Sequence, residues 1–196
     1  MNKKLTFLLA LTFLFLFSSG VFGDDFQDFR DHLDAVNAYQ KEDYKTAHRL
    51  WLPLAEQGNA DAQYNLGKIY EKGRVVQQDY KEAVKWYKRA ETMLRGFIYN
   101  NGHQCFVDCD HHVRYPEALY NLGLMYAKGH GVSKDYVIAH SWFNSAATFG
   151  EHEGSKNWLN KLEKEMTPQQ IEEAKKHAMS MNRMSSHAGY TELKFY

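Results

Sequence analysis

Apolar residues recur every three or four positions along most of this chain, and that spacing predicts amphipathic α-helices. In the segment 60–90 a first helix carries an apolar stripe of Ala62, Leu66 and Ile69. Gly73 stands where this helix would end, and Asp79 stands at the N-cap position of a second helix. The second helix carries apolar residues on one face, namely Tyr80, Ala83, Val84, Tyr87 and Ala90. The segment therefore predicts a helical hairpin, which buries its apolar faces only when it stacks on neighbours.

The same pattern occurs a second time, 56 positions further along the chain. Segments 60–90 and 116–146 are identical at 14 of 31 aligned positions. The identical pairs include Tyr64/Tyr120, Gly67/Gly123, Asp79/Asp135 and Trp86/Trp142. Repetition of a two-helix pattern is typical of stacked helical repeats, so it decides the fold class before any single motif is considered.

The repeated string A-x-YNLG-x-x-Y-x-x-G-x-x-V-x-x-DY-x-x-A-x-x-W resembles the Sel-one-like repeat, a relative of the tetratricopeptide repeat. The match covers 60–90 and 117–150, although Val75 stands in the first copy where the second has Gly131 of the family's G-x-G-V loop. The resemblance implies an all-α fold, an α/α solenoid of stacked antiparallel hairpins. It also implies a non-enzymatic scaffold that binds another protein of the bacterial envelope or of a host. Some relatives have been proposed to act on cell-wall or β-lactam substrates, and an envelope hydrolase is therefore the first alternative.

A weaker unit precedes the two clear copies and covers 24–59. Its second helix follows the clear repeats at a period of 36 residues, with Tyr44 corresponding to Tyr80 and Asp43 in the place of the capping aspartate. The stripe of its first helix is predicted to consist of Leu33, Val36 and Tyr39. The period therefore predicts one more hairpin at the N-terminal end of the array.

Three further segments complete the predicted organisation. An insertion at 92–115 separates the two clear repeats, which occupy about 60–91 and 116–150. A fourth unit covers about 151–184, and its last helix, opened by Thr167 and Pro168, is predicted to cap the array. Residues 185–196 have no periodicity and are predicted to form a flexible tail.

The first 23 residues have the composition of a signal peptide. Lys3 and Lys4 precede a 13-residue apolar run, Leu5 to Phe17, and a possible cleavage site ends at Gly23. A 13-residue helix is about 20 Å long, which is shorter than the hydrocarbon core of about 30 Å. We therefore expect a periplasmic or secreted protein that holds no membrane segment after cleavage, with an uncleaved membrane anchor as the alternative.

Charge and motifs argue against two function classes. The chain has 24 basic and 24 acidic residues, so it lacks the basic excess typical of nucleic-acid binding. The motifs of serine hydrolases, zinc proteases and phosphate-binding loops are absent from the sequence. We therefore expect a monomer without enzymatic activity and without a cofactor.

The insertion holds both cysteines of the chain, Cys105 and Cys109. In an exported protein two nearby cysteines most often form a disulfide, which is the prediction made here. Thiolates and imidazoles at short spacing can also bind a tetrahedral metal ion, and the alternative ligands are His103, Cys105, Cys109, His111 and His112. A metal-binding module is thus the second alternative function, and free thiols are a third state of these cysteines.

The predicted partner surface lies on the first helices of the repeats. In hairpin arrays these helices line the concave side, where their non-core positions face a partner. The predicted contact residues are Tyr64, Asn65, Lys68, Tyr120, Asn121 and Leu124. The alternative for Tyr64 and Tyr120 is that both rings pack against the neighbouring helices.

Overall fold

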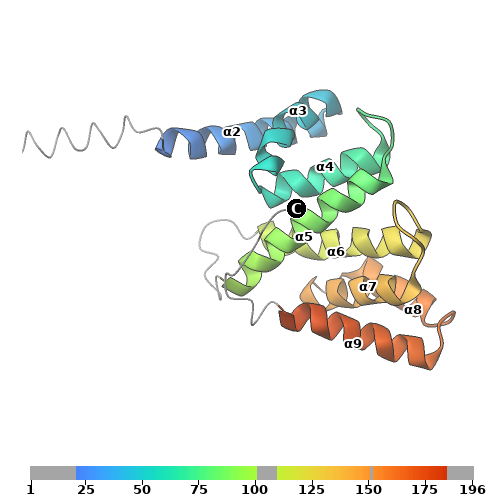
Figure 1. Cartoon of the computed structure of the whole chain (residues 1–196). Helices are drawn as coiled ribbons and strands as arrows, with labels where there is room; N and C mark the ends of the chain where they lie inside the picture. The colour runs from blue at the N-terminus through green and yellow to red at the C-terminus, as the bar shows by residue number, and fades with distance from the viewer. Residues whose placement is uncertain (1–20, 101–109, 151, 185–196) are drawn as a thin grey trace, which may run out of the picture.

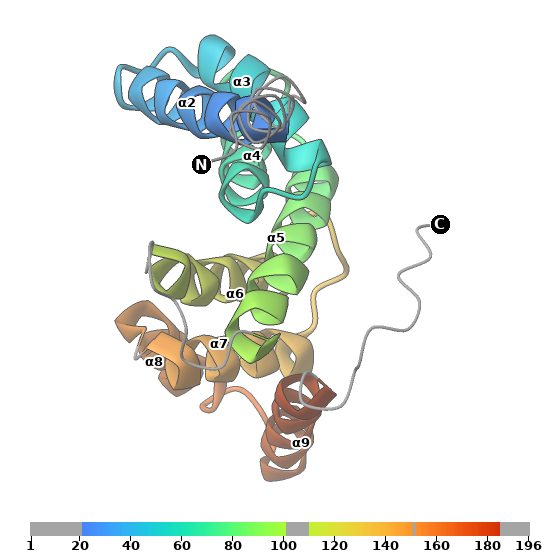
Figure 2. The same ribbon diagram turned by 90° about the vertical axis from the view of Figure 1, so that its left-hand side faces the viewer.

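Residues 21–100, 110–150 and 152–184 are those that the computed structural model describes, and every regular element in these ranges is an α-helix. The helices are α2 (Val21–Gln40), α3 (Tyr44–Glu56), α4 (Ala60–Lys72), α5 (Tyr80–Asn100), α6 (Asp110–Lys128), α7 (Tyr136–Gly150), α8 (Glu153–Leu162) and α9 (Pro168–Met184). Each contacts the next from α2 to α8, and α9 lies against α7 (Figure 1). Figure 2 shows α4, α6 and α8 following one another along one side, with α5 and α9 on the other. The predicted all-α solenoid with a C-terminal capping helix is confirmed.

The predicted helix boundaries follow from capping side chains. Asp79 accepts a hydrogen bond from the Glu82 N–H at 3.0 Å, and the equivalent Asp135 accepts one from the Ile138 N–H at 2.9 Å. Gly73 ends α4 in the left-handed conformation, with φ of 62°, as expected for a residue without a Cβ atom. The predicted start of α9 is also confirmed, because the side chains of Thr167 and Gln170 bind each other's backbone N–H groups.

The loops of the two clear repeats close in the same way despite their sequence difference. The Asp79 N–H donates to the Tyr70 carbonyl at 3.0 Å, and the Asp135 N–H donates to the Tyr126 carbonyl at the same distance. Gly131 has φ of 73°, and a Cβ atom there would lie 2.3 Å from the carbonyl oxygen of Tyr80. The second loop therefore requires glycine because it packs directly against the start of α5.

Buried side chains form three clusters, each of which joins neighbouring hairpins. The N-terminal cluster contains Trp51 of α3 together with residues of α2 and α4, and it also includes Trp86 of α5. The middle cluster extends from α4 to α7 and includes Tyr87. The C-terminal cluster joins α6, α7, α8 and α9 around Phe143. The adjacent residues Trp86 and Tyr87 thus belong to different clusters, so α5 contributes to two of them.

The two helices of each clear repeat approach closely at a glycine. A Cβ atom at Gly67 would lie 2.5 Å from Cε1 of Tyr87, and one at Gly123 would lie 2.6 Å from Cε1 of Phe143. Real Cβ contacts essentially never fall below 3.0 Å. The spacing that the two copies share therefore places an aromatic ring of the second helix directly on a glycine of the first.

The predicted stripe of α2 differs from the observed one. Leu33 is 46% exposed and Val36 only partly buried, whereas the fully or nearly buried residues are Ala35 and Ala38. Val36 and Tyr39 pack against the N-terminal cluster, as predicted. Leu33, two positions before Ala35, lies on nearly the opposite side of the helix from the face centred on Ala35 and Ala38. The predicted stripe is therefore confirmed for Val36 and Tyr39 and wrong for Leu33.

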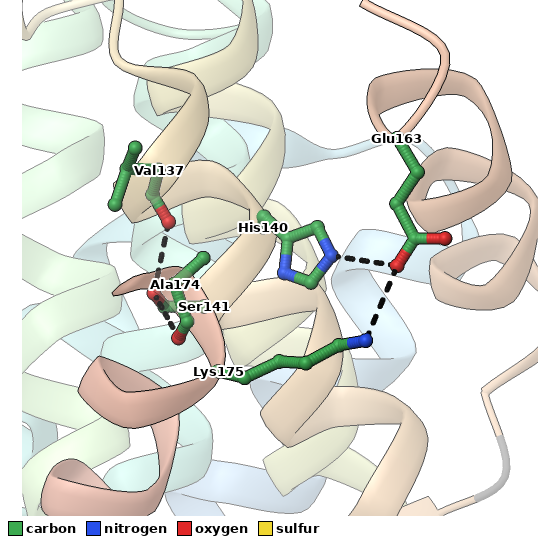
Figure 3. A network of polar contacts seen from close by, with 6 residues as sticks. All are labelled: Val137, His140, Ser141, Glu163, Ala174 and Lys175. Carbon is green, nitrogen blue, oxygen red and sulfur yellow. Dashed lines mark hydrogen bonds and ion pairs between the residues drawn. The ribbon is translucent and has the colours of Figure 1, made fainter. Parts of the chain in front are cut away.

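Polar contacts attach the C-terminal segment to α7 (Figure 3). The Ser141 hydroxyl lies 2.8 Å from the Val137 carbonyl oxygen and 3.0 Å from that of Ala174 in α9. The buried His140 places Nε2 3.1 Å from Oε1 of Glu163, just past the end of α8. The Lys175 ammonium lies 3.9 Å from the same carboxylate oxygen. One short network thus joins the last two helices to α7.

The insertion is partly helical. Helix α5 continues beyond the repeat into the insertion, and it ends at Asn100. Helix α6 begins at Asp110, so Pro116 lies inside this helix rather than at its start. Residues 1–20, 101–109 and 185–196 lie outside the described part. These ranges include most of the predicted signal peptide and all of the predicted tail. Within the described ranges, no helix is both long and apolar enough to cross a membrane.

Candidate partner-binding face

The predicted contact residues fall into two groups by exposure. Tyr64 and Asn65 of α4 are buried, with 8% and 5% of their surface exposed. The other four, which are partly exposed, are Lys68, Tyr120, Asn121 and Leu124. We call these four residues the first-helix face, because they lie on α4 and α6, the first helices of the two clear repeats. Of the six predicted contact residues, these four keep part of their surface exposed, whereas Tyr64 and Asn65 do not.

Tyr64 is held between the hairpins. Its ring centroid lies 5.8 Å from that of Tyr87, and it belongs to the middle buried cluster. The Lys68 ammonium lies 5.5 Å from the centroid of Tyr64 and 5.0 Å from that of Tyr39 at the end of α2. A cation over two aromatic faces is attracted by both, so Lys68 links α4 to α2 while its side chain stays partly exposed. Tyr64 therefore packs against the neighbouring helices, which was the alternative to a contact with a partner.

Tyr120 repeats this arrangement and adds a contact with the next unit. Its ring lies 5.7 Å from that of Phe143, which is the counterpart of Tyr87, and 4.5 Å from that of His152. His152 Nδ1 accepts a hydrogen bond from the Ser155 N–H at 3.0 Å and thereby caps α8. In the neutral imidazole Nε2 therefore carries the hydrogen atom. This N–H donates a hydrogen bond to Oε1 of Glu117, 3.2 Å away. His152 therefore orients Tyr120 and fixes α8 beside α6.

A partly buried hydrogen bond joins the two helices of the first clear repeat. The Tyr87 hydroxyl donates to Oε2 of Glu71 at 2.6 Å. Burial of the ring, followed by the neighbouring Glu71 carboxylate, raises the pKa of Tyr87 well above its ordinary value. Tyr87 is therefore protonated at neutral pH and serves as a donor that fixes the two helices of the repeat.

The first-helix face combines chemical groups that suit a polypeptide. Lys68 can bind a carboxylate, the Asn121 amide can pair with a peptide group, and Leu124 and the Tyr120 ring offer apolar area. Residues of 21–100, 110–150 and 152–184 contain no group of three His, Cys, Asp or Glu side chains placed to hold a metal ion.

The predicted cysteine site lies largely outside the described residues. His103, Cys105 and Cys109 belong to the segment 101–109. His111 and His112 belong to α6, but their side chains lie outside the described part of the structure. The disulfide and its metal-binding alternative therefore both stay predictions.

Sequence reasoning overlooked two residues that shape this face, Tyr39 and His152. Tyr39 was assigned only to the stripe of α2, yet its ring receives the Lys68 ammonium. His152 precedes α8 at the N-cap position, where aspartate, asparagine, serine or threonine is the usual signal. Only its position before a predicted helix could have indicated its capping role.

Comparisons with known proteins agree with this architecture. A model of the Sel1 repeat matches the chain at 38–59, 60–93 and 116–148. The "ERAD-associated E3 ubiquitin-protein ligase component HRD3B" of Arabidopsis thaliana is 33% identical over 94 residues, which is 41% of this chain and 15% of the relative. "Protein sel-1 homolog 2" of Homo sapiens is 30% identical over 113 residues, which is 57% of this chain and 14% of the relative. The chain thus matches only a small part of these curated relatives.

Two solved structures have a similar fold. A protective antigen of uropathogenic Escherichia coli strains, which displays an SLR fold, superposes with a TM-score of 0.63 and 23% identity over 86% of this chain and 34% of its own. A Sel1 repeat protein from Oxalobacter formigenes gives a TM-score of 0.52 and 28% identity over 70% of this chain and 91% of its own. Sel1 repeat proteins are generally scaffolds for protein–protein interaction. The matched repeats and the shared architecture show that this chain is a Sel1 repeat protein of the tetratricopeptide-like helical class.

Proposed function

We propose that this protein is a non-enzymatic adaptor of the bacterial cell envelope, which binds a partner protein on the first-helix face. The observation that carries the proposal is the contrast between buried and exposed residues on α4 and α6. Tyr64 and Asn65 are enclosed, while Lys68, Tyr120, Asn121 and Leu124 keep part of their surface exposed. Rigid support beneath exposed apolar and polar groups reduces the entropy lost on binding.

The proposed location rests on the N-terminal sequence. The basic start at Lys3 and Lys4, followed by the apolar run from Leu5 to Phe17, is typical of a signal peptide. Export would place the repeats in the periplasm or outside the cell, with a partner from the envelope or from a host. The proposal predicts that the mature protein begins near Asp24, which N-terminal sequencing of the exported protein can test.

Site-specific photo-crosslinking in cells tests the binding face. A photoreactive amino acid at Leu124 should give a discrete covalent adduct with the partner, because this side chain lies in the proposed contact. The matched control is Lys81, an exposed residue at the start of α5, where the same amino acid should give no such adduct.

Binding measurements with the partner so identified complete the test. Leu124→Glu places a charge in the proposed contact and should weaken binding by about tenfold or more, whereas Lys81→Glu should not. Thermal melting must show that Leu124→Glu remains folded. A folded Leu124→Glu variant that binds as the unaltered protein does would contradict the proposed face.

A further inference from the structure

Helix α2 exposes an apolar strip at the open end of the array. Phe29 is 54% exposed and Leu33 is 46% exposed, and both rank among the few large apolar side chains exposed in the described residues. They stand four positions apart, and the partly buried Val36 continues the same side of the helix. We call Phe29, Leu33 and Val36 the α2 strip. Apolar residues at this spacing are what one helix offers to another.

Helix α2 is the first of the described helices. It has 20 residues and its partner α3 has 13, so the start of α2 extends past the hairpin (Figure 1). Helix α9 covers α7 at the other end of the array, whereas no described helix packs on α2 from the N-terminal side. Among the described helices, the two ends of the solenoid therefore differ, because a capping helix covers only the C-terminal end.

The charge around the α2 strip is strongly negative. Residues 24–40 contain five aspartates and one arginine, a formal charge of −4, although the whole chain is neutral. Asp34 is exposed, and Asp28 and Asp31 are partly exposed. A second copy of α2 packed on this strip would bring two such helices together, and like charges at close range disfavour that pairing. A helix with basic residues beside an apolar stripe complements both the charge and the shape.

We propose that the α2 strip is a docking site for a basic amphipathic helix of a partner protein, separate from the first-helix face. Phe29 and Leu33 would insert between apolar residues of the incoming helix, and the aspartates of α2 would pair with its lysines or arginines. The partner helix would extend the array by one element, in the place that α9 occupies at the opposite end. This site does not depend on the first-helix face, because no residue is shared by the two surfaces.

Titration of the purified mature protein with synthetic helices tests the proposal. The probe is a peptide of about 18 residues, or about five turns, with leucines at helical spacing and lysines elsewhere. The control probe is the same peptide with glutamates in place of the lysines. Isothermal titration calorimetry should show binding of the basic peptide and no binding of the acidic one. Binding should also weaken as salt is added, because exposed charges are screened.

Variants of the protein locate the binding site. Phe29→Ser with Leu33→Ser should weaken binding of the basic peptide by about tenfold or more. Met179→Ser is the matched control, since Met179 is 61% exposed on α9 at the other end, and it should bind as the unaltered protein does. The double variant Asp28→Asn, Asp34→Asn keeps the apolar side chains of the α2 strip and should also weaken binding of the basic peptide. It provides a second test of the site if the serine variant does not fold.

Three results would overturn the proposal. The first is the absence of binding of the basic peptide. The second is equal binding to the unaltered protein and to a folded Phe29→Ser, Leu33→Ser variant, which would indicate attraction by charge alone. The third is a stable dimer in sedimentation velocity that the serine substitutions dissociate, because the strip would then be covered by a second copy.

Discussion

The contact between Gly67 and the Tyr87 ring joins the two helices of the first clear repeat, and changing it tests how the array is held together. Gly67 lies under the ring of Tyr87, and an added Cβ atom would lie 2.5 Å from Cε1 and 2.6 Å from Cδ1 of that ring. The ring has little freedom to move, because Tyr87 is fully buried and its hydroxyl is bonded to Glu71. A substitution at Gly67 must therefore push α4 and α5 apart.

Gly67→Val should destabilise the protein by about 1–3 kcal/mol, the usual range for overpacking. For a chain of this size each kcal/mol lowers the melting temperature by roughly 2–4 °C, so the expected decrease is about 2–12 °C. Gly123→Val should have a similar effect, since its Cβ atom would lie 2.6 Å from Phe143. Differential scanning calorimetry measures both, and Lys81→Val at an exposed position serves as the control.

The sign of the effect distinguishes overpacking from helix propensity. Replacing glycine in a helix normally stabilises it, by up to about 1 kcal/mol for alanine. In a Tyr87→Val background the ring atoms nearest to Gly67 are absent, so Gly67→Ala should become neutral or stabilising. An equal loss of stability from Gly67→Ala with and without the Tyr87 ring would refute the proposed cause. Equal melting temperatures for Gly67→Val, Gly123→Val and Lys81→Val would refute the register of the hairpins.

Two further predictions concern pH and the cysteines. Burial lowers the pKa of His48 below its ordinary value of 6.5, so the unfolded chain takes up the proton more readily and stability is lost as the pH falls below that value. The melting temperature should therefore fall between about pH 7 and pH 5, less so in His48→Gln, and an equal fall in both proteins would exclude His48 as a source. If Cys105 and Cys109 form a disulfide, the non-reduced mature protein will be lighter by two hydrogen atoms in mass spectrometry than the free-thiol form. Because the loop is short, Cys105→Ser should cost about 2 kcal/mol or less, and free thiols or bound zinc would exclude the disulfide.

The repeats could be predicted because their signals are local and occur twice. Asp79 and Asp135 occupy the same place in two aligned segments, and each caps a helix in the structure. The stripe of α2 was predicted only in part, because Val36 and Tyr39 pack against the N-terminal cluster whereas Leu33 is exposed. The buried face is centred on Ala35 and Ala38, and an apolar residue at helical spacing can be exposed as well as buried, so the sequence alone does not separate Leu33 from the other two.

The candidate site was only partly predictable, because exposure depends on contacts between repeats. Tyr64 and Tyr120 occupy equivalent positions, but Tyr64 is buried and Tyr120 is partly exposed. Each of the two rings has a different additional contact. The Lys68 ammonium lies over the Tyr64 ring, and the His152 ring lies against the Tyr120 ring. Truncating Tyr64 would therefore disturb the fold as well as any binding, and Leu124 is the better position at which to probe a partner.

The sharing of aromatic residues between clusters determines how the array can open. Trp86 and Trp142 each belong to the cluster on the N-terminal side, and the residues that follow them, Tyr87 and Phe143, belong to the cluster on the C-terminal side. Two adjacent aromatic residues on one helix therefore link each cluster to the next. We therefore expect loosening to proceed inward from an end, and to begin at the hairpin of α2 and α3, because no described helix covers α2 from the N-terminal side. A partner bound to α2 would oppose opening at that end and would thereby stabilise the whole solenoid.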